Sequence, residues 1–320
     1  MLVPAAQARF ELPAIELEIT SRCNARCVMC PRPVLREHRG FAHMTPEVFA
    51  AVVRNVGGRG VPAYHLCGIG EPLLHPLCLE FAAALRRADP AARIVCVTNG
   101  FSLQPERLDA LLGSPIDVLE VSLHALDEAV HRSILRSFRV GRALERLEAL
   151  LARRAALGSS LDVRIGQVLV APHPTADAEL AAWAAGHGLP FATWRAWNRA
   201  GHVPEEMVTD DASEPRAFAG TNRSPEVCSD YATMLFIDHR GDVLSCCCDF
   251  ANETTEGNAA EHSLEALLAR RHETLASGQP LSPICERCDA PATNKPFLPT
   301  DYFAVARKPL PGGGQEPPNR

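Results

Sequence analysis

Three cysteines near the start of the chain have the type and spacing to bind an iron–sulfur cluster. Cys23, Cys27 and Cys30 form the pattern C-x-x-x-C-x-x-C within EITSRCNARCVMCPR, directly after a short apolar run. Three thiolates on one short loop can bind three irons of a 4Fe-4S cluster and leave the fourth iron open to another ligand. A structural zinc site is the alternative, but such a site needs four ligands, and no fourth cysteine or histidine is placed nearby. The triad therefore predicts an iron centre with one open position.

A second set of cysteines lies near the end of the chain and could close another metal site. Cys228, Cys246 and the pair Cys285–Cys288 supply four thiolates from three separated segments. Four thiolates bind either an iron–sulfur cluster or a structural zinc ion, and spacing alone does not separate the two. Cys246 has the ligand spacing, which leaves Cys247 and Cys248 unassigned. In an extended strand Cys246 and Cys248 would share one face, and Cys247 would point to the other.

The other cysteines and the histidines have simpler interpretations. The chain has twelve cysteines in 320 residues, a share far below that of a disulfide scaffold. The first twenty residues carry charges where a signal peptide has its apolar region, so we expect reduced thiols in the cytoplasm. Three cysteines in apolar contexts are expected to be packing residues: Cys67, Cys78 and Cys96. Three histidines without a partner at recognisable spacing are expected to be structural: His65, His124 and His131.

Composition excludes several classes of function. The 32 basic and 38 acidic residues give a net charge of -6, so no general attraction to nucleic acid or to an anionic membrane is expected. No run approaches the roughly 18 consecutive apolar residues of a membrane-spanning helix. With 47% hydrophobic and 22% charged residues, the chain is typical of a globular protein. Its substrate must be recognised locally.

The segment from residue 14 to about 200 predicts the scaffold that positions the first cysteine set. Six candidate strands cover residues 14–19, 64–68, 93–100, 117–125, 163–170 and 190–197. Helical patterns lie between them, among them Pro46–Asn55, Leu77–Ala88 and Arg142–Leu157, the last with one leucine stripe. This alternation is typical of parallel βα units and predicts an α/β fold, a partial (β/α)6 barrel. Functional residues are expected at the C-terminal ends of its strands.

Composition also divides the chain into five segments. Residues 1–13 precede the barrel of 14–200, and 201–225 form a polar, proline-containing linker. Residues 226–302 are expected to form a small auxiliary domain that contains the second cysteine set and a hairpin, with strands 235–237 and 242–245 around the turn DHRG. Residues 303–320 are rich in proline and glycine and are expected to be disordered.

These features together resemble the radical S-adenosylmethionine (radical SAM) superfamily. The resemblance implies that the open iron binds the amino and carboxylate groups of SAM. One electron from the cluster then cleaves SAM to a 5'-deoxyadenosyl radical. The second candidate strand ends in Gly68-Ile69-Gly70-Glu71-Pro72, which resembles the family's G-G-E-P motif with Ile69 in place of the central glycine. Gly68 and Gly70 are then expected to let the backbone approach SAM, and Glu71 to accept a hydrogen bond from its ammonium group.

The resemblance also implies further SAM contacts on the barrel rim. Thr98 and Asn99 close the third candidate strand, and Ser122 lies near the end of the fourth. All three resemble positions that contact the SAM ribose or carboxylate, although strand-end turns also favour these residue types. Arg195 and Asn198, near the sixth strand, could reach SAM or substrate, or be ordinary surface residues.

The second cysteine set resembles the SPASM and shorter Twitch extensions of radical SAM enzymes. The shared features are a hairpin glycine (Gly241), a later Gly257-Asn258 and a helix (Leu264–His272) before the last cysteine pair. Six cysteines fit one auxiliary 4Fe-4S cluster of the Twitch type better than the two of a full SPASM domain. The implied cluster ligands are Cys228, Cys246, Cys285 and Cys288.

Three functions remain open from the sequence. The first is a radical SAM epimerase that abstracts hydrogen from a carbinol carbon of a sugar or aminocyclitol, or from a peptide α-carbon. Cys248, with Cys247 as second choice, then returns a hydrogen atom. The second is a radical SAM dehydrogenase whose auxiliary cluster takes the second electron, and the third a non-enzymatic scaffold. The overall resemblance is to the small Twitch-bearing enzymes of aminoglycoside antibiotic biosynthesis, and the triple cysteine favours epimerase. The implied partners are a small-molecule or peptide substrate and an electron donor such as flavodoxin or ferredoxin.

Overall fold

The centre of the molecule is a curved parallel sheet. The structure, a computed structural model, describes residues 13–137, 139–173, 177–196, 198–208, 231, 233–276 and 282–288. The six parallel strands are β1 (Ala14–Leu17), β2 (Ala63–Leu66), β3 (Arg93–Thr98), β4 (Val118–Ser122), β5 (Asp162–Leu169) and β6 (Phe191–Arg195), adjacent in chain order. The predicted α/β partial barrel is confirmed. Each strand ends earlier than the sequence predicts, because the chain turns there into the loops that carry the candidate site residues.

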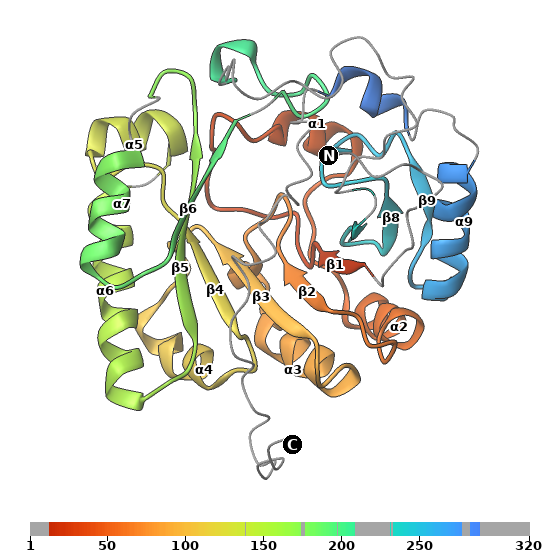
Figure 1. The fold of residues 1–320 in the computed structure, drawn as a ribbon, viewed down its shortest axis with the longest axis horizontal. Helices are drawn as coiled ribbons and strands as arrows, with labels where there is room; N and C mark the ends of the chain where they lie inside the picture. Colours follow the sequence, from red (N-terminus) through yellow and green to blue (C-terminus); the bar gives the residue numbers. More distant parts are fainter. Residues whose placement is uncertain are drawn as a thin grey trace.

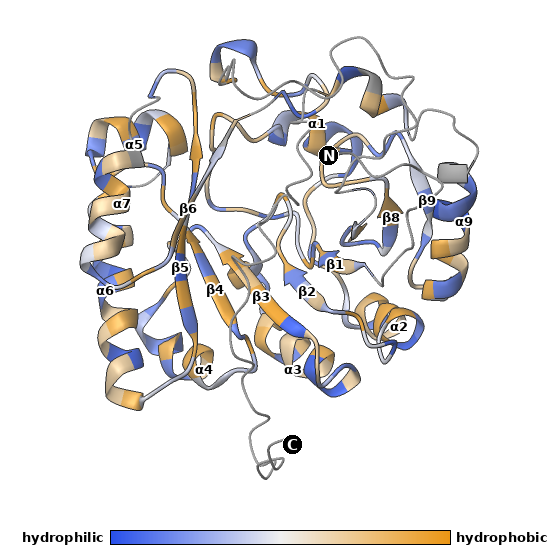
Figure 2. Ribbon diagram, viewed as in Figure 1, coloured by the Kyte–Doolittle hydropathy of each residue, from blue (hydrophilic) through white to orange (hydrophobic). Residues whose placement is uncertain are grey.

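Helices cover the outer side of the sheet (Figure 1). The described helices of residues 13–208 are α1 (Arg32–His38), α2 (Pro46–Val56), α3 (Cys78–Ala88), α4 (Leu108–Gly113), α5 (Glu128–Leu135), α6 (Val140–Leu157) and α7 (Asp177–Gly186), with short 3-10 turns η2 (Pro72–Leu74), η3 (Pro105–Arg107) and η4 (Glu205–Met207). Helix α6 shows why they form: it buries Val140, Ala143, Leu147 and Leu150 along one stripe. Figure 2 shows the same contrast between apolar central strands and helices with one polar side.

The C-terminal segment continues the barrel sheet. Strands β7 (Met234–Ile237) and β8 (Asp242–Leu244) form the predicted hairpin, followed by β9 (Thr255–Asn258), α9 (Leu264–Ala276) and η5 (Pro283–Arg287). Strand β7 pairs in parallel with β1, with Ala14 opposite Met234. The nine strands therefore form one sheet of order β6-β5-β4-β3-β2-β1-β7-β8-β9, and the second cysteine set is attached to the first strand of the barrel.

A buried ionic group fixes the hairpin against the loops of the first half. Glu18, after β1, forms a buried ion pair with Arg39, whose Nε lies 3.6 Å from Oδ2 of Asp238 in the hairpin turn. His239 Nδ1 lies 3.4 Å from Glu18 Oε1. The backbone N–H of Ile69 donates to Glu18 Oε2 at 2.9 Å. Removing one member of such a group leaves a buried charge uncompensated, so these contacts hold the loops in one arrangement.

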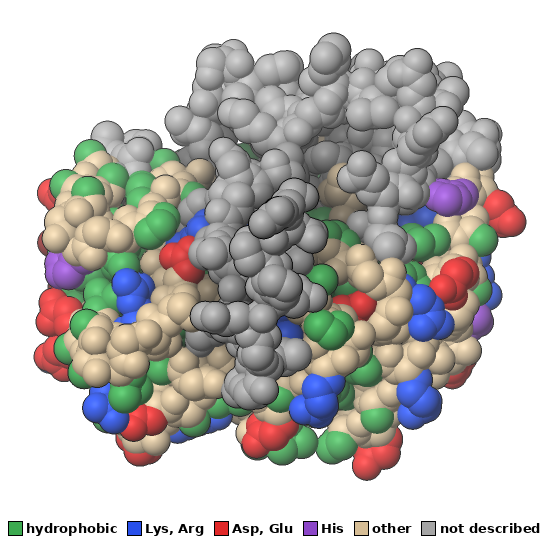
Figure 3. Space-filling model, turned by 60° about the horizontal axis from the view of Figure 1, so that its bottom comes forward, with side chains coloured by type: hydrophobic (Ala, Val, Ile, Leu, Met, Phe, Trp, Pro, Cys, Tyr) green, Lys and Arg blue, Asp and Glu red, His purple; other side chains and the backbone are tan. Residues whose placement is uncertain are grey.

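Some expectations fall outside the described residues. They concern the segment 1–12, Cys228, residues 209–225 of the linker and the tail 303–320. The described start of the linker packs on the barrel, since Val203 is buried. None of the described helices combines the length and apolar character needed to cross a bilayer. Figure 3 shows acidic and basic side chains interspersed over one face of the molecule.

Candidate active site

The loop between β1 and α1 carries the first cysteine set at the C-terminal edge of the sheet. Cys23, Cys27 and Cys30 are all partly exposed there. The backbone N–H of Ala25 donates to Cys23 Sγ at 3.4 Å, and the side-chain amide of Asn99 donates to the same sulfur at 3.7 Å. Burial raises the pKa of Cys30 to about 11. N–H donors directed at a sulfur stabilise a thiolate, which is the form that binds iron.

The segment 68–70 needs its glycines to pack against this loop. A Cβ on Gly70 would lie 1.9 Å from the carbonyl oxygen of Thr20, and Gly68 has φ +135° and no room beside Glu18. Ile69, in the position of the expected central glycine, joins a small apolar cluster with Leu35, Cys248 and Phe250. Cys30 and Cys246 pack against that cluster. The departure from the motif therefore fills the space between the two cysteine sets.

Glu71 joins the residues predicted to contact SAM. Its carboxylate accepts hydrogen bonds from the Thr98 hydroxyl (2.7 Å) and the Asn99 backbone N–H (2.8 Å), while its own N–H donates to the Arg22 carbonyl (2.8 Å). Burial raises the pKa of Glu71 to about 7. The Asn99 side chain donates to Asn24 Oδ1 at 2.7 Å. Hydrogen bonds thus join the segments after β2 and β3 to the loop that carries Cys23, Cys27 and Cys30.

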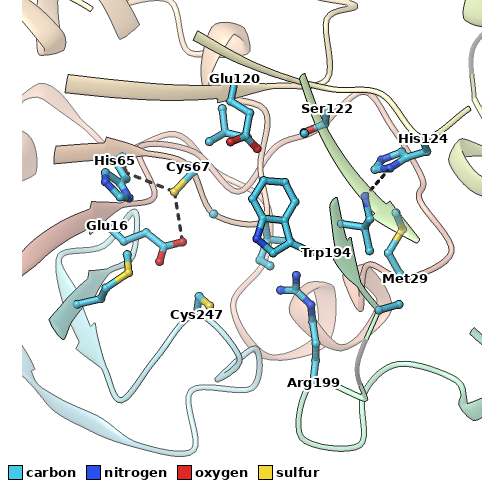
Figure 4. A pocket seen from close by; sticks show the side chains of 17 residues that line it. Glu16, Met29, His65, Cys67, Glu120, Ser122, His124, Trp194, Arg199 and Cys247 are labelled. Atoms are coloured by element: carbon cyan, nitrogen blue, oxygen red, sulfur yellow. Dashed lines mark hydrogen bonds between the residues drawn. The ribbon is translucent and has the colours of Figure 1, made fainter. Parts of the chain in front are cut away.

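A cavity of about 170 Å³ lies at the C-terminal ends of the strands. That is room for a small molecule rather than a single water. Gly68 and Ser122, two of the predicted site residues, line it, as does Cys247. Figure 4 shows the ring of Trp194 in the middle of the view, between Glu120 and Arg199. The cavity is where a substrate of the site would bind.

Several residues of this lining were not predicted from the sequence. Glu16 on β1 and Glu120 on β4 face the cavity, and Arg199 lies beyond β6. Cys67, expected to be a packing residue, also lines it, and its thiol donates to Glu16 Oε1 at 3.3 Å. The available signal was an acidic residue inside an otherwise apolar strand, which in a barrel must face either the interior or an ion-pair partner.

Histidines and carboxyls in the lining have strongly shifted pKa values because they are buried. His65 and His124, expected to be only structural, line the cavity too. Burial and the nearby Arg93 lower the pKa of His65 to about 4. Burial lowers the pKa of His124 to about 3. Burial raises the pKa of Glu120 to about 8, with Arg164 acting in the opposite direction. Both histidines are therefore neutral at pH 7 and add no cation to the cavity.

The structure corrects the expected extended strand through Cys246–Cys248. Strand β8 ends at Leu244 and the chain turns, with the Asp249 N–H donating to the Cys246 carbonyl at 3.2 Å. Residues 246–248 therefore form a turn, and Cys246 and Cys248 do not share one face of a strand. Cys248 is buried and hydrogen-bonded to the thiols of Cys246, Cys247 and Cys288, whereas Cys247 lines the cavity. Cys248 thus lies with the candidate cluster ligands, and Cys247 faces the substrate side.

The remaining predicted residues have varied positions. Arg195 ends β6, and the structure does not describe its side chain. Asn198 donates to the carbonyl oxygen of Arg287 at 2.9 Å, so it ties the end of the barrel to the last cysteine pair. Cys78 and Cys96 are fully buried, as expected of packing residues. In the described part of the chain, no three His, Cys, Asp or Glu side chains surround a single metal-ion position.

Family comparisons match both halves of the chain. Residues 17–161 match the radical SAM superfamily, and residues 228–289 match SPASM, an iron–sulfur cluster-binding domain. The first range contains the triad and the segment 68–72. The second contains Cys228, Cys246–Cys248, Cys285 and Cys288.

Curated relatives share part of this chain. A GTP 3',8-cyclase of Chlorobaculum tepidum is 32% identical over 140 residues, 43% of this chain and 41% of that protein. A GTP 3',8-cyclase of Paenarthrobacter nicotinovorans is 29% identical over 224 residues, 64% of this chain and 61% of that protein. A protein of Pyrococcus furiosus described as modifying the cofactor of tungsten-containing aldehyde ferredoxin oxidoreductase is 28% identical over 144 residues, 45% of this chain and 39% of that protein. The chain thus spans less than two thirds of each of these relatives.

Solved structures share the fold over most of the chain. BtrN, in complex with AdoMet and 2-DOIA, covers 92% of this chain and 99% of its own, with TM-score 0.58 and 18% identity. SuiB of Streptococcus suis, bound to the precursor peptide SuiA, covers 89% of this chain and 73% of its own, with TM-score 0.65 and 15% identity. At these identities the likeness concerns the fold alone.

Proposed function

We propose that this chain, which carries a radical SAM domain followed by a SPASM domain, is an epimerase of a sugar or aminocyclitol. The observation that carries the proposal is the Cys247 thiol in the lining of the cavity at the barrel mouth. A thiol beside a substrate radical can return a hydrogen atom to it. Ser122 and Gly68, at the ends of β4 and β2, line the same cavity, so the thiol shares one space with two residues predicted to contact SAM.

Both cysteine sets fit iron–sulfur clusters, because soft thiolates are the ligands that such clusters take. Cys23, Cys27 and Cys30 would hold the SAM-binding 4Fe-4S cluster, with the N–H donors of Ala25 and Asn99 directed at Cys23. The auxiliary cluster would be held by the second set: Cys228, Cys246, Cys285 and Cys288. When bound, the first cluster and SAM supply a 5'-deoxyadenosyl radical that removes one hydrogen atom from the substrate.

The hydrogen atoms and electrons of the proposed turnover balance as follows. The substrate C–H bond breaks homolytically, and its hydrogen leaves as part of 5'-deoxyadenosine. The S–H bond of Cys247 then breaks, and its hydrogen atom forms the new C–H bond on the opposite face of the carbon. The sulfur radical left behind takes up one proton and one electron, which comes from a donor of the flavodoxin or ferredoxin class. Cleavage of SAM takes a further electron from the same donor, so each turnover consumes one SAM and two electrons. Such an electron supply and reduced thiols are expected in the cytoplasm.

The cavity favours a neutral or cationic substrate over a nucleoside triphosphate. The carboxyl groups of Glu16 and Glu120 line it, and Arg199 is the one lysine or arginine among its described lining residues. An ionised carboxyl repels a triphosphate, and a protonated one offers it no positive charge. This argues against a cyclase of GTP, the activity in the names of the curated relatives. A dehydrogenase remains the second candidate. In that reaction the auxiliary cluster would take an electron from the substrate ketyl radical, and no thiol would return a hydrogen atom. A peptide substrate is a further alternative.

The experiment compares Cys247→Ala with Cys248→Ala and with a buried control, Cys78→Ala. Each anaerobically reconstituted holoenzyme is incubated with SAM, reductant and a panel of aminocyclitols and hexoses. Cys247→Ala is expected to form 5'-deoxyadenosine but no epimer, while Cys78→Ala forms both. Epimer formation by Cys247→Ala at the rate of the unchanged protein would show that another group donates the hydrogen. Loss of bound iron in Cys248→Ala alone would support its place among the cluster ligands.

A further inference from the structure

Glu120 presents a carboxyl group to the cavity without a protein partner for one of its oxygens. Its side chain comes from β4 and is 5% exposed. Within the described residues, its Oε2 is buried and accepts no hydrogen bond. Figure 4 shows the carboxyl beside the ring of Trp194. A buried carboxyl oxygen without a donor is unfavourable, so a ligand that supplies a donor there would bind with a clear gain.

The neighbouring strand is shaped to admit this carboxyl group. A Cβ on Gly166 of β5 would lie 2.4 Å from Glu120 Oε1 and 2.9 Å from the Trp194 ring. No larger residue could stand there without moving both side chains. The glycine therefore lets the carboxyl of Glu120 and the face of Trp194 occupy the same corner of the cavity.

The charged groups on the strands around Glu120 already have partners, so the Glu120 carboxyl is available to a cation from a ligand. Arg164 on β5, whose charge acts on Glu120, forms an ion pair with Asp162, with Nη2 2.6 Å from Oδ2. Glu16 on β1 accepts the thiol hydrogen of Cys67 and also interacts with Arg199. A cation bound at Glu120 would neutralise the charge of this carboxyl, as Arg199 does for Glu16. The ring of Trp194 offers the bound cation an aromatic face.

We infer that this cavity binds a substrate with a protonated amine on a small saturated ring, held by hydrogen bonds to Glu120 and packed against Trp194. The inference rests on the proposed function, since it selects aminated substrates within the class proposed above. According to this inference, Glu120 makes the cavity bind an aminocyclitol more tightly than the neutral analogue. A charge-assisted hydrogen bond of this kind is about twice as strong as a neutral one.

The test measures equilibrium binding rather than turnover, so that it is independent of the hydrogen-donation step. Anaerobic holoenzyme with SAM is titrated at pH 8.5, above the pKa of about 8, with scyllo-inosamine and, separately, with scyllo-inositol, which has a hydroxyl in place of the amine. The unchanged protein is expected to bind the amine at least about tenfold more tightly, or 1.4 kcal/mol. Glu120→Gln is expected to bring the two affinities within about threefold of each other.

A glycine pair provides a second, independent route to the same result. Gly166→Ala should displace the Glu120 carboxyl and remove the amine preference, whereas Gly141→Ala on α6, where no atom lies within 4 Å of the new Cβ, should keep it. Equal affinities in the unchanged protein, binding of neither compound, or an amine preference that survives Glu120→Gln would each overturn the inference. Amine-selective binding without an epimerised product would instead contradict the proposed function alone.

Discussion

The guanidinium of Arg271 donates to the carbonyl oxygen of Ser245 at 3.0 Å, directly before the three consecutive cysteines. The same side chain donates to the carbonyl oxygens of Tyr231, Met234 and Leu244 and pairs with Glu256 at 2.6 Å. It is 1% exposed. One arginine of α9 therefore joins the start of β7, the end of β8 and β9, and it sets the position of the Cys246–Cys248 turn.

Arg271→Met should lower the free energy of unfolding by about 3–5 kcal/mol, because it leaves buried carbonyl groups and Glu256 without their partner. The matched control is Arg153→Ala, whose ion pair with Asp109 is exposed and should contribute little to stability. Denaturant unfolding of the two variants gives the comparison. Equal losses would show that the Arg271 contacts do not stabilise the hairpin.

Replacing Cys23, Cys27 and Cys30 together by alanine should remove one of two clusters. The reconstituted protein is expected to hold about eight irons and the variant about four, because three cysteines serve the open cluster and four the closed one. SAM cleavage should be lost. Iron and sulfide analysis measures both proteins, and stoichiometric zinc in place of the second iron set would refute the auxiliary iron–sulfur cluster.

Glu71→Ala should weaken SAM binding without changing the iron content. The variant loses the acceptor predicted for the SAM ammonium group and the bonds from Thr98 and the Asn99 backbone, and charge-assisted hydrogen bonds are about twice as strong as neutral ones. Titration with SAM under anaerobic conditions measures the affinity. The exposed Glu148→Ala on α6 is the control. If both variants bind SAM like the unchanged protein, Glu71 only stabilises the strand-end turn.

Amine binding to the cavity should strengthen as the pH rises from 6.5 to 8.5. Burial raises the pKa of Glu120 to about 8, so the carboxyl is mostly neutral at low pH and becomes an anion only as the pH passes that value. The other charged or titratable groups of the cavity lining are Glu16, His65, Cys67, His124, Arg199 and Cys247, and the charge of Arg164 on β5 also acts on Glu120. Affinity for scyllo-inosamine should rise by about tenfold, and Glu120→Gln should make it flat. A rise of the same size in Glu120→Gln would assign the titration to another group.

The sequence was sufficient to predict the scaffold and the triad, because both depend on patterns among residues close together in the chain. Alternation of strand and helix patterns indicated the six parallel strands, and the spacing of Cys23, Cys27 and Cys30 does not depend on the fold. The hairpin around Gly241 was equally local, since its turn residues lie between two apolar runs.

The cavity could not be predicted, because its lining comes from strands far apart in the chain. Glu16 and Glu120 line one cavity only because the barrel curves. Cys67 lies two residues after His65, and both face the same cavity. The expected strand through Cys246–Cys248 was wrong for a different reason. An extended strand was assumed through residue 248, whereas β8 ends at Leu244, and the turn that follows buries Cys248 and presents Cys247.

The mass of the product formed in deuterated water tests the central claim most directly. A thiol exchanges its proton with solvent, so hydrogen returned by Cys247 carries one deuterium to the inverted carbon. The product should be one mass unit heavier than the substrate, with one 5'-deoxyadenosine formed for each product. A product two mass units lighter than the substrate, without solvent deuterium, would contradict the epimerase and establish a dehydrogenase.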